Sequence, residues 1–371
     1  MSAPLRFADP GARYRAHKAE VDAAVRRVLD SGYFIGGPEV EAFEAEFAAW
    51  SGRAHAVGVG NGTDALRLAL MAHDIGPGDA VLTVAHTAVA TVAAISMAGA
   101  TPVFVDVEPT HLLLDLDALD AACTATTRAV IAVHLYGHPL DLDRLSAWCA
   151  ARDLVLIEDC AQAHGARWRD RPVGGWGSAA CYSFYPTKNL GALGDGGGVT
   201  TDDPALAARI RRLRSYGWDA TRLSHEPGIN SRLDPLQAAI LRVGLRHLDA
   251  EVARRGALAA RYAEKLADLP LGLPQVAREA RHAWHLYVVR TPERDALAGH
   301  LRAAGVHPGV HYPVAAHRHP AWADGSALPV TEKACAEVLS LPMHPALTFA
   351  QQDRVIGAIR RFYETRPEPS R

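Results

Sequence analysis

The stretch from Ala80 to Val105 contains no aspartate, glutamate, lysine or arginine, and Asp79 and Asp106 bracket it. Its length is sufficient to cross a bilayer. Polar residues occur within it, however, and a glycine and a proline interrupt it. The pattern therefore favours a strand, a buried helix and a second strand inside an α/β protein over a membrane span.

Strand-like apolar runs alternate with helical segments over the first two thirds of the chain. Continuous apolar strands in such an alternation indicate a mainly parallel sheet that helices cover on both faces. The last two runs follow one another too closely for a crossover helix, so we expect a mixed sheet. The predicted strands are residues 80–84, 102–107, 129–135, 154–158, 178–184 and 197–201.

A long stretch rich in Ala, Leu and Arg begins after residue 231 and is typical of a helix. The chain has 371 residues, enough for two domains. We predict a large domain with an N-terminal arm over residues 1–248. A smaller α+β domain, with a strand at residues 284–290, is expected over residues 249–371.

Charge and cysteine content argue against several classes of protein. The 39 basic and 41 acidic residues nearly balance, so we expect no binding to nucleic acid or to an anionic membrane. The five cysteines form no CxxC pair, which argues against a disulfide framework and a metal site. The first residues show no signal-peptide pattern. We therefore expect a cytoplasmic protein.

A glycine-rich turn in VGVGNGTDALRLAL joins a β-rich run to a helix that we expect to begin at about Thr63. Backbone N–H groups and the dipole at a helix start form an anion site that suits a phosphate. The turn is also one residue short of the dinucleotide fingerprint G-x-G-x-x-G. Taken alone, it is compatible with a nicotinamide-dependent oxidoreductase.

Two further segments place ionisable side chains at strand ends. In LIEDCAQAHGA, Glu158 and Asp159 end a buried strand, where open α/β sheets bind ligands, and Gln162 follows. In SFYPTKNLGALGDGGG, Lys188 precedes the glycines, whereas in a P-loop the glycines come first. Burial lowers the pKa of a lysine and frees its amine to form a Schiff base. A solvated surface lysine is the alternative.

The three segments in this order form the set that pyridoxal 5'-phosphate (PLP) requires. That cofactor needs an anion site for its phosphate, a carboxylate opposite its pyridine nitrogen and a lysine for its aldehyde. The combination favours a PLP enzyme over the oxidoreductase, which leaves Lys188 unexplained.

The chain resembles the DegT/DnrJ/StrS family of PLP-dependent sugar-nucleotide aminotransferases. The resemblance covers nearly the whole sequence and implies an α/β fold of the fold-type I PLP-transferases. That fold has a large domain with a mixed, mostly parallel sheet flanked by helices, and a smaller C-terminal α+β domain. The resemblance rests on GYFIGGPEVEAFEAEFA, GVGNGTDALRLAL, AGATPVFVDVEP, IEDCAQAHGA, SFYPTKNLGALGDGGG, GINSRLDPLQAAIL and HYPVAAHRHP.

The resemblance also implies roles for individual residues. Lys188 would bind the cofactor aldehyde, Asp159 would pair with the pyridinium nitrogen, and Gln162 would contact the ring hydroxyl. The neighbouring subunit would contribute one phosphate contact, so the active site would lie at a homodimer interface. The implied phosphate contacts are Gly62, Thr63, Asp64 and Ser183, with Asn230 from the neighbour.

One position departs from the family pattern. Many members stack an aromatic residue on the cofactor ring where this chain has Ala88. We therefore expect His86 to cover the ring instead.

The implied reaction moves an amino group from L-glutamate to a nucleotide-linked ketosugar, with Lys188 transferring the proton. Sugar dehydratases of the family have histidine at that lysine position, so Lys188 favours transamination. The segment FYPTKNLGALGDGG, with Tyr185 three residues before Lys188, resembles that of members that aminate C3 of dTDP-3-keto-6-deoxyhexoses. The alternatives are a C4 aminotransferase, a scyllo-inosose-type aminocyclitol aminotransferase and a non-catalytic PLP-binding member.

We expect the sugar to contact histidine and tyrosine side chains near the cofactor. Four arginines between residues 209 and 214 could meet its diphosphate, although a solvated helix face is the simpler interpretation. The predicted sugar contacts are Tyr33, Tyr185, His311, Tyr312 and His317, with His319 near the same mouth.

Overall fold

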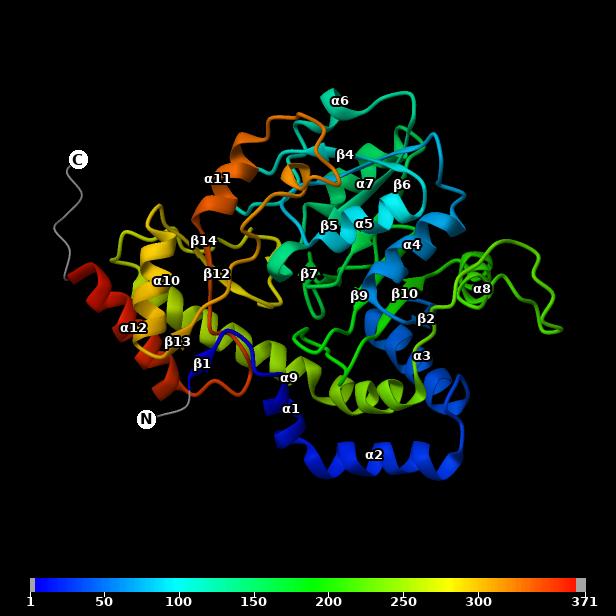
Figure 1. The fold of residues 1–371 in the computed structure, drawn as a ribbon, viewed down its shortest axis with the longest axis horizontal. Coiled ribbons are helices and arrows are strands. Elements are labelled where there is room, and N and C mark those ends of the chain that lie inside the picture. The colour runs from blue at the N-terminus through cyan, green and yellow to red at the C-terminus, as the bar shows by residue number, and fades with distance from the viewer. Residues whose placement is uncertain (1–3, 365–371) are drawn as a thin grey trace.

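The computed structural model describes residues 4–364 and has a seven-stranded sheet at its centre (Figure 1). β10 runs antiparallel to both β2 and β9, and the other strand pairs of this sheet are parallel, so the predicted mixed, mostly parallel sheet is confirmed. The strand order is β2 (His55–Val59), β10 (Gly197–Thr201), β9 (Ala179–Ser183), β6 (Val155–Asp159), β5 (Thr127–Val133), β3 (Ala80–Val84) and β4 (Thr101–Val105).

The six strands predicted for this sheet agree with the observed ones to within two residues at each end. The uncharged stretch folds as expected into β3, the buried helix α5 (Val89–Met97) and β4. β6 ends one residue later than predicted, which makes Asp159 its last residue. Within residues 4–364, no helix has the length and apolar character that a membrane crossing requires.

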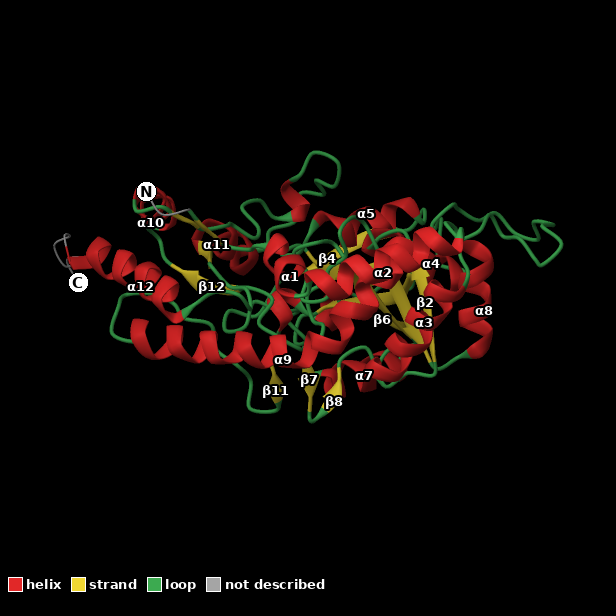
Figure 2. Cartoon of the chain, turned by 90° about the horizontal axis from the view of Figure 1, so that it is seen from below, coloured by secondary structure: helices red, strands yellow, loops and turns green. Residues whose placement is uncertain are grey.

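Helices cover both faces of the sheet. Figure 2 shows α4 and α5 on one side and α7 on the other. Pro38 begins α3 as its fixed φ predicts, and two glutamates in the first turn suit the positive helix end. The bounds are α3 (Pro38–Ser51), α4 (Gly62–Ala72), α6 (Leu119–Ala122), α7 (Leu142–Ala150) and α8 (Pro204–Leu213).

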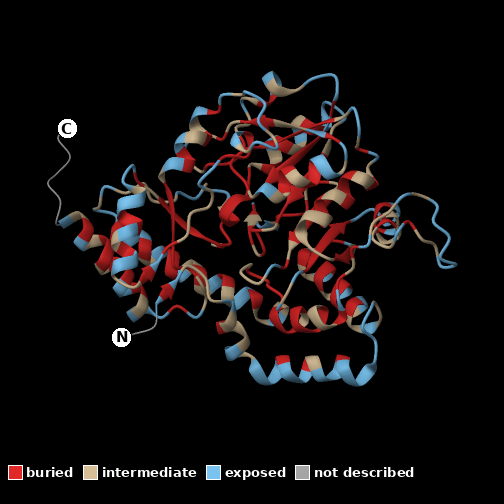
Figure 3. Ribbon diagram, viewed as in Figure 1, coloured by how far each residue is buried: buried red, intermediate tan, exposed pale blue. Residues whose placement is uncertain are grey.

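The long helix α9 (Pro235–Leu266) connects two cores. Its first half packs on the N-terminal helices α1 (Pro10–Ala16) and α2 (Lys18–Ser31), and α2 presents its outer face to solvent (Figure 3). From Leu258 onward its side chains belong to a second hydrophobic cluster, formed with the C-terminal elements. This change of core lies in the helix where we predict the domain boundary.

The C-terminal region is built on the antiparallel pair β12 (Tyr287–Arg290) and β14 (Val338–Leu341). β12 begins later than predicted because Trp284 has a left-handed φ of 50° and stacks on His282. Helices α10 (Arg294–Ala303), α11 (Pro329–Glu337) and α12 (Phe349–Glu364) surround the pair. The short strand β1 (Leu5–Arg6) joins this region by pairing with β13 (Val306–His307). A small separate sheet contains β7 (Arg167–Trp168), β8 (Arg171–Pro172) and β11 (Ala280–Arg281).

Glu158 anchors the end of β6 from inside the core. Its fully buried carboxylate accepts hydrogen bonds from the N–H groups of Gly174, Trp176 and Gly177, each at 2.7 Å. His134 Nε2 lies 3.1 Å from the same carboxylate. Burial alone would raise the pKa of Glu158, but the bonds from His134 and the N–H groups outweigh it and lower the pKa.

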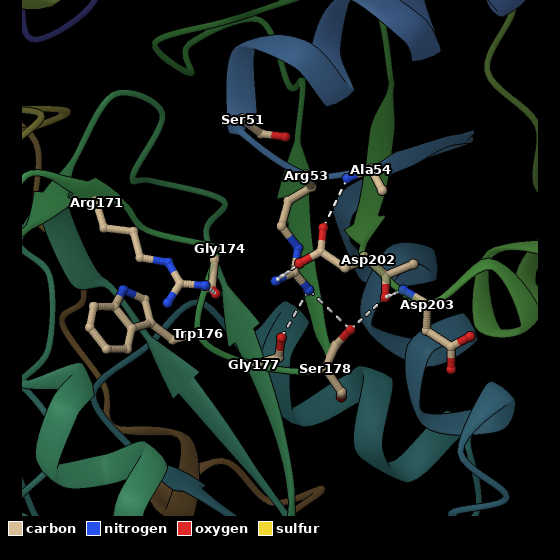
Figure 4. Close-up of polar contacts among 12 residues, drawn as sticks. Ser51, Arg53, Ala54, Arg171, Gly174, Trp176, Gly177, Ser178, Asp202 and Asp203 are labelled. Atoms are coloured by element: carbon tan, nitrogen blue, oxygen red, sulfur yellow. Dashed lines mark hydrogen bonds and ion pairs between the residues drawn. The ribbon is translucent and has the colours of Figure 1, made fainter.

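Arg53 also binds the segment that Glu158 holds (Figure 4). The buried Arg53 guanidinium donates to the carbonyls of Gly177 (2.9 Å) and Ser178 (3.3 Å) and pairs with Asp202 at 3.0 Å. Residues 174–178 are therefore held through their N–H groups by Glu158 and through two of their carbonyls by Arg53.

We predict that Glu158→Ala lowers the free energy of unfolding by about 3–5 kcal/mol. Removing one partner of a buried charged cluster costs about 3–5 kcal/mol, and here three N–H groups and His134 lose their acceptor. Because the folded-state pKa of Glu158 lies below its ordinary 4.5, the stabilisation is present above pH 4.5 and is lost as the pH falls through the lower value.

Urea unfolding of both proteins at several pH values measures this difference. Glu41→Ala, at an exposed position of α3, is the control and should change stability by less than about 0.5 kcal/mol. Equal urea midpoints for wild type and Glu158→Ala at pH 7 would contradict the anchoring role.

Candidate active site

A cavity of about 470 Å³ lies at the carboxyl ends of the parallel strands. We call it the central cavity. It brings together side chains from segments that are far apart in the sequence, as expected for an open α/β sheet. Its lining includes Gly62, Thr63, Thr87, Ala88, His134, Asp159, Gln162, Ser183, Tyr185, Lys188, His285, His311 and Tyr312.

The N-terminus of α4 forms one wall of the central cavity. Asn61 caps this helix by accepting a hydrogen bond from the N–H of Asp64 at 2.8 Å. The N–H groups of Gly62 and Thr63 lie in the first turn, which has no intrahelical partners for them and suits an anion. A Cβ on Gly62 would lie 2.7 Å from Ser183 Cβ, so only glycine lets the helix approach β9.

The side chain of Asp64 is occupied elsewhere. Its Oδ2 accepts hydrogen bonds from Ser231 Oγ (2.6 Å) and Asn61 Nδ2 (3.0 Å), and Asp64 is absent from the cavity lining. A phosphate contact of Asp64 would therefore come from its backbone N–H, which donates to Asn61 Oδ1 at 2.8 Å, and that contact stays a prediction. Ser183, by contrast, does face the central cavity.

Asp159 ends β6 with its carboxylate in the central cavity and only 6% of its surface exposed. Thr91 Oγ1 donates to Oδ2 at 2.8 Å, and the N–H of Ala161 donates to Oδ1 at 3.1 Å. Burial raises the pKa of Asp159, and these two bonds and the nearby Lys188 charge oppose that rise.

Lys188 lies opposite, in the turn that follows β9. Its N–H donates to the carbonyl of Tyr185 at 2.8 Å, and the Asn189 side chain donates to the carbonyl of Ala283 at 2.8 Å. Arg13 also donates to the Asn189 carbonyl, which ties the N-terminal arm to this turn. Burial lowers the pKa of Lys188 to about 8, although the charge of Asp159 raises it. Lys188 is partly buried and lines the central cavity, which argues against a solvated surface lysine.

Gln162 connects two walls of the central cavity. Its Oε1 accepts a hydrogen bond from the N–H of Tyr136 at 2.6 Å, and its Nε2 donates to Tyr312 Oη at 3.0 Å. Burial raises the pKa of Tyr312 to about 12, so its phenol is neutral. His311 bonds Ser340 Oγ at 2.8 Å, and burial lowers its pKa to about 4.

The structure does not bring His86 to the central cavity, which corrects the expectation that it covers a ring there. His86 is fully buried, with Nε2 at 2.7 Å from Tyr136 Oη and Nδ1 at 3.4 Å from Cys335 Sγ. Burial lowers its pKa to about 4. The cavity wall at this place is formed by Thr87 and Ala88.

Three of the predicted sugar contacts line the central cavity and two do not. Tyr185, His311 and Tyr312 are in the lining, and Tyr185 is 53% exposed at its edge. His317 is buried with Nε2 at 3.1 Å from Glu332, away from the cavity, which corrects that prediction. Tyr33 is exposed and outside the lining.

Other predicted residues also lie outside the lining. Asn230 is exposed, and His319 contacts the Trp322 ring. The four arginines of residues 209–214 are partly buried and bind acidic side chains of this chain, so they form neither a solvated helix face nor a free site for a diphosphate. These pairs are Arg209 with Asp74 and Glu226, Arg212 with Glu226, and Arg211 and Arg214 with Glu44.

Sequence reasoning missed four residues of the site. Thr87 and Thr91 are four residues apart, which places both hydroxyls on one face of a helix start, but nothing in the sequence relates that face to Asp159. His134 follows β5 and His285 precedes β12. Other histidines of the chain also lie next to strands, so this position alone does not identify a site residue. Among the described residues, Nδ1 of the buried His285 has no hydrogen-bond partner.

An anion site, a buried carboxylate and a lysine of lowered pKa face one cavity, which fits the three groups of PLP that a protein must hold. The cavity and the sheet that carries it define a PLP-dependent enzyme of the α/β class. The family comparison identifies it further.

The model of the DegT/DnrJ/EryC1/StrS aminotransferase family matches residues 15–360, and the chain belongs to this family. It is 51% identical to the dTDP-3-amino-3,4,6-trideoxy-alpha-D-glucose transaminase of Streptomyces venezuelae over 96% of each chain. It is 50% identical to the erythromycin biosynthesis sensory transduction protein EryC1 of Saccharopolyspora erythraea, over 95% of this chain and 98% of that one.

Solved structures show the same fold. The structure of DesV from S. venezuelae in complex with a ketimine intermediate has a TM-score of 0.96 and 48% identity, and covers 99% of this chain and 100% of that one. A second, ntda from Bacillus subtilis with bound PMP, has a TM-score of 0.88 and 29% identity, and covers 94% of this chain and 82% of that one. The family is PLP-dependent, so PLP is the cofactor of this chain.

We predict that the Lys188 amine of the cofactor-free protein titrates near pH 8, because burial disfavours its charged form. Competitive labelling with acetic anhydride, followed by mass spectrometry across pH 6–11, measures this pKa. Asp159→Asn should lower the Lys188 pKa further, since the carboxylate that raises it is removed.

The exposed Lys333 serves as the internal reference for reagent reactivity in the same digests. A Lys188 labelling curve that coincides with that of Lys333 would show that burial does not perturb this amine.

Proposed function

We propose that this chain transfers an amino group from L-glutamate to C3 of a dTDP-linked 3-keto-6-deoxyhexose. The observation that carries the proposal is the presence of Lys188 and Asp159 in one cavity, with a lysine pKa of about 8. At neutral pH a useful fraction of such an amine is unprotonated. Lys188 Nζ can therefore carry a proton from Cα of the amino donor to the C4′ atom that PLP would place beside it, and in the second half of the reaction from that atom to C3 of the sugar.

PLP supplies the electron sink and the aldehyde for this chemistry when it is bound. The other contributions come from the chain itself. We propose that Gly62, Thr63 and Ser183 bind the phosphate, that Asp159 keeps the pyridine nitrogen protonated, and that Gln162 contacts the ring hydroxyl. Gln162 is already fixed at both ends of its amide, so it can orient the ring without losing rotamer entropy.

The sugar class follows from the relatives and from the cavity edge. Two transaminases at 51% and 47% identity are named for dTDP-3-amino-3,4,6-trideoxy-alpha-D-glucose. A third, at 41%, is named for dTDP-3-amino-3,6-dideoxy-alpha-D-galactopyranose. We propose that the sugar enters between Tyr185, His311 and Tyr312, and that the preferred acceptor lacks the C4 hydroxyl.

A homodimer with shared active sites fits the surface of the chain. Apolar side chains at residues 33–35 are more than half exposed, as is Leu223 beside the segment that carries Asn230. Such exposed apolar groups are typical of an interface between copies. We propose that Asn230 completes the phosphate site of the partner subunit. The free cysteines, most of them buried, support a cytoplasmic enzyme.

We predict that purified enzyme with L-glutamate aminates dTDP-3-keto-4,6-dideoxyglucose at C3, with its 4-hydroxy analogue as a poorer acceptor. NMR of the product identifies the aminated carbon. Lys188→Ala should lose about 10³-fold or more in rate, because the base that moves the proton is removed. Amination of dTDP-4-keto-6-deoxyglucose at C4, or of scyllo-inosose alone, would replace the proposed acceptor with the alternative class.

We also predict complementation between two inactive variants. Lys188→Ala and Asn230→Ala homodimers each lack one component of both sites, whereas a hybrid dimer has one intact site. Random mixing by co-expression should restore about a quarter of wild-type activity if subunits share sites. Separately purified proteins assayed without subunit exchange are the control. Mixed dimers that stay inactive would show that Asn230 acts within its own subunit or not at all.

A further inference from the structure

Two threonine hydroxyls form a short hydrogen-bonded chain that ends at the carboxylate of Asp159. Thr91 Oγ1 donates to Asp159 Oδ2 at 2.8 Å, and Thr87 Oγ1 lies 3.0 Å from Thr91 Oγ1. Thr91 is fully buried, and Thr87, 3% exposed, belongs to the cavity lining. The other carboxylate oxygen accepts the N–H of Ala161 at 3.1 Å.

The direction of these bonds follows from the charge of the carboxylate. An ionised carboxylate only accepts hydrogen bonds, so the Thr91 proton must point at Asp159. The Thr91 oxygen can then only accept from Thr87, which orients the Thr87 hydroxyl as well. Both dipoles have their positive ends toward Asp159, and hydrogen bonds in such a chain strengthen one another at low dielectric.

The backbone supports the same charge. Thr91 is the third residue of α5, so the carboxylate lies beside the first turn of that helix. The helix dipole favours a negative group there. Ala88, the N-cap residue, offers no side-chain oxygen to this helix end, which leaves its field directed at nearby anions.

We propose that Thr91, oriented by Thr87, is a positioning residue that keeps Asp159 ionised and aimed at the pyridine nitrogen of PLP. This rests on the proposed function, in which Asp159 meets that nitrogen. A protonated Asp159 could not hold the nitrogen in its charged form, and the ring would lose its capacity to accept electrons.

The need for such support comes from burial. Burial raises the pKa of Asp159, and the Thr91 hydroxyl is the foremost of the groups that lower it, followed by the Ala161 N–H and Lys188. Thr91 is thus the strongest uncharged group that opposes protonation. The titratable groups near Asp159 are Lys188 after β9, His134 after β5, Glu158 and Cys160 beside it, Cys181 on β9 and Tyr312 from the C-terminal region.

The test compares PLP binding to cofactor-free wild type, Thr91→Val, Thr91→Ser and Thr83→Val between pH 5 and 9. Thr91→Val keeps the shape and removes the hydroxyl, whereas Thr91→Ser retains it. Thr83 is the matched control, because it is equally buried and donates to the carbonyl of Ile131 at 3.1 Å outside the central cavity.

We expect Thr91→Val to bind PLP about tenfold more weakly at pH 7. The acid limb of its affinity should move up by about one pH unit, since lost hydrogen bonding to a charge is worth about that much. Thr91→Ser and Thr83→Val should stay within about twofold of wild type with the limb unmoved. Thr87→Val should move the limb in the same direction by a smaller amount, and it replaces Thr91→Val if that variant does not fold.

Asp159→Asn separates failure of this inference from failure of the proposed site. If Asp159→Asn binds PLP as wild type does, the nitrogen is not at Asp159 and both proposals fall. If Asp159→Asn binds weakly while Thr91→Val loses affinity equally at every pH, Thr91 only packs against the site. That result, or wild-type binding by Thr91→Val, overturns the positioning role alone.

Discussion

The active site depends on two adjacent carboxylates at the end of β6 that face opposite sides of the strand. Successive side chains of a strand alternate in direction, so Glu158 and Asp159 cannot serve the same purpose. Glu158 turns into the core and is fixed by three backbone N–H groups and His134. Asp159 turns into the central cavity. The rigidity that the first carboxylate gives to the strand end determines where the second one lies.

Burial of the site disfavours the charged forms of both Asp159 and Lys188. Desolvation lowers the pKa of Lys188 and raises that of Asp159, and the attraction between the two groups opposes both changes. The pKa of Lys188 is left at about 8, close to the working pH, which suits a general base. Asp159 depends on Thr91 and Ala161 for its charge. The chain thus gives each group the protonation state its role needs through different neighbours, although both lie in one low-dielectric space.

Much of this arrangement could be predicted from the sequence, because it follows from local patterns. Apolar runs located the strands, and the position of Asp159 and Lys188 at strand ends located the cavity. The placement of His86 could not be read in this way, since its side chain is fixed by Tyr136 and Cys335, which are distant in the sequence. The pairing of β1 with β13 joins chain segments about 300 residues apart and is too short to leave a periodic signal.

Tyr136 couples the position of Gln162 to that of the loop at His311 and Tyr312. Its backbone has a φ of 60°, a left-handed conformation that costs a non-glycine residue energy and persists only where surrounding contacts impose it. In that conformation its N–H donates to Gln162 while its phenol donates to the carbonyl of His311. Gln162 in turn donates to Tyr312, so the loop at His311 and Tyr312 is joined twice to the cavity wall that carries Gln162 and Tyr136. Because Tyr136 takes part in both connections, a change that shifts Tyr136 must displace Gln162 and the loop at His311 and Tyr312 together.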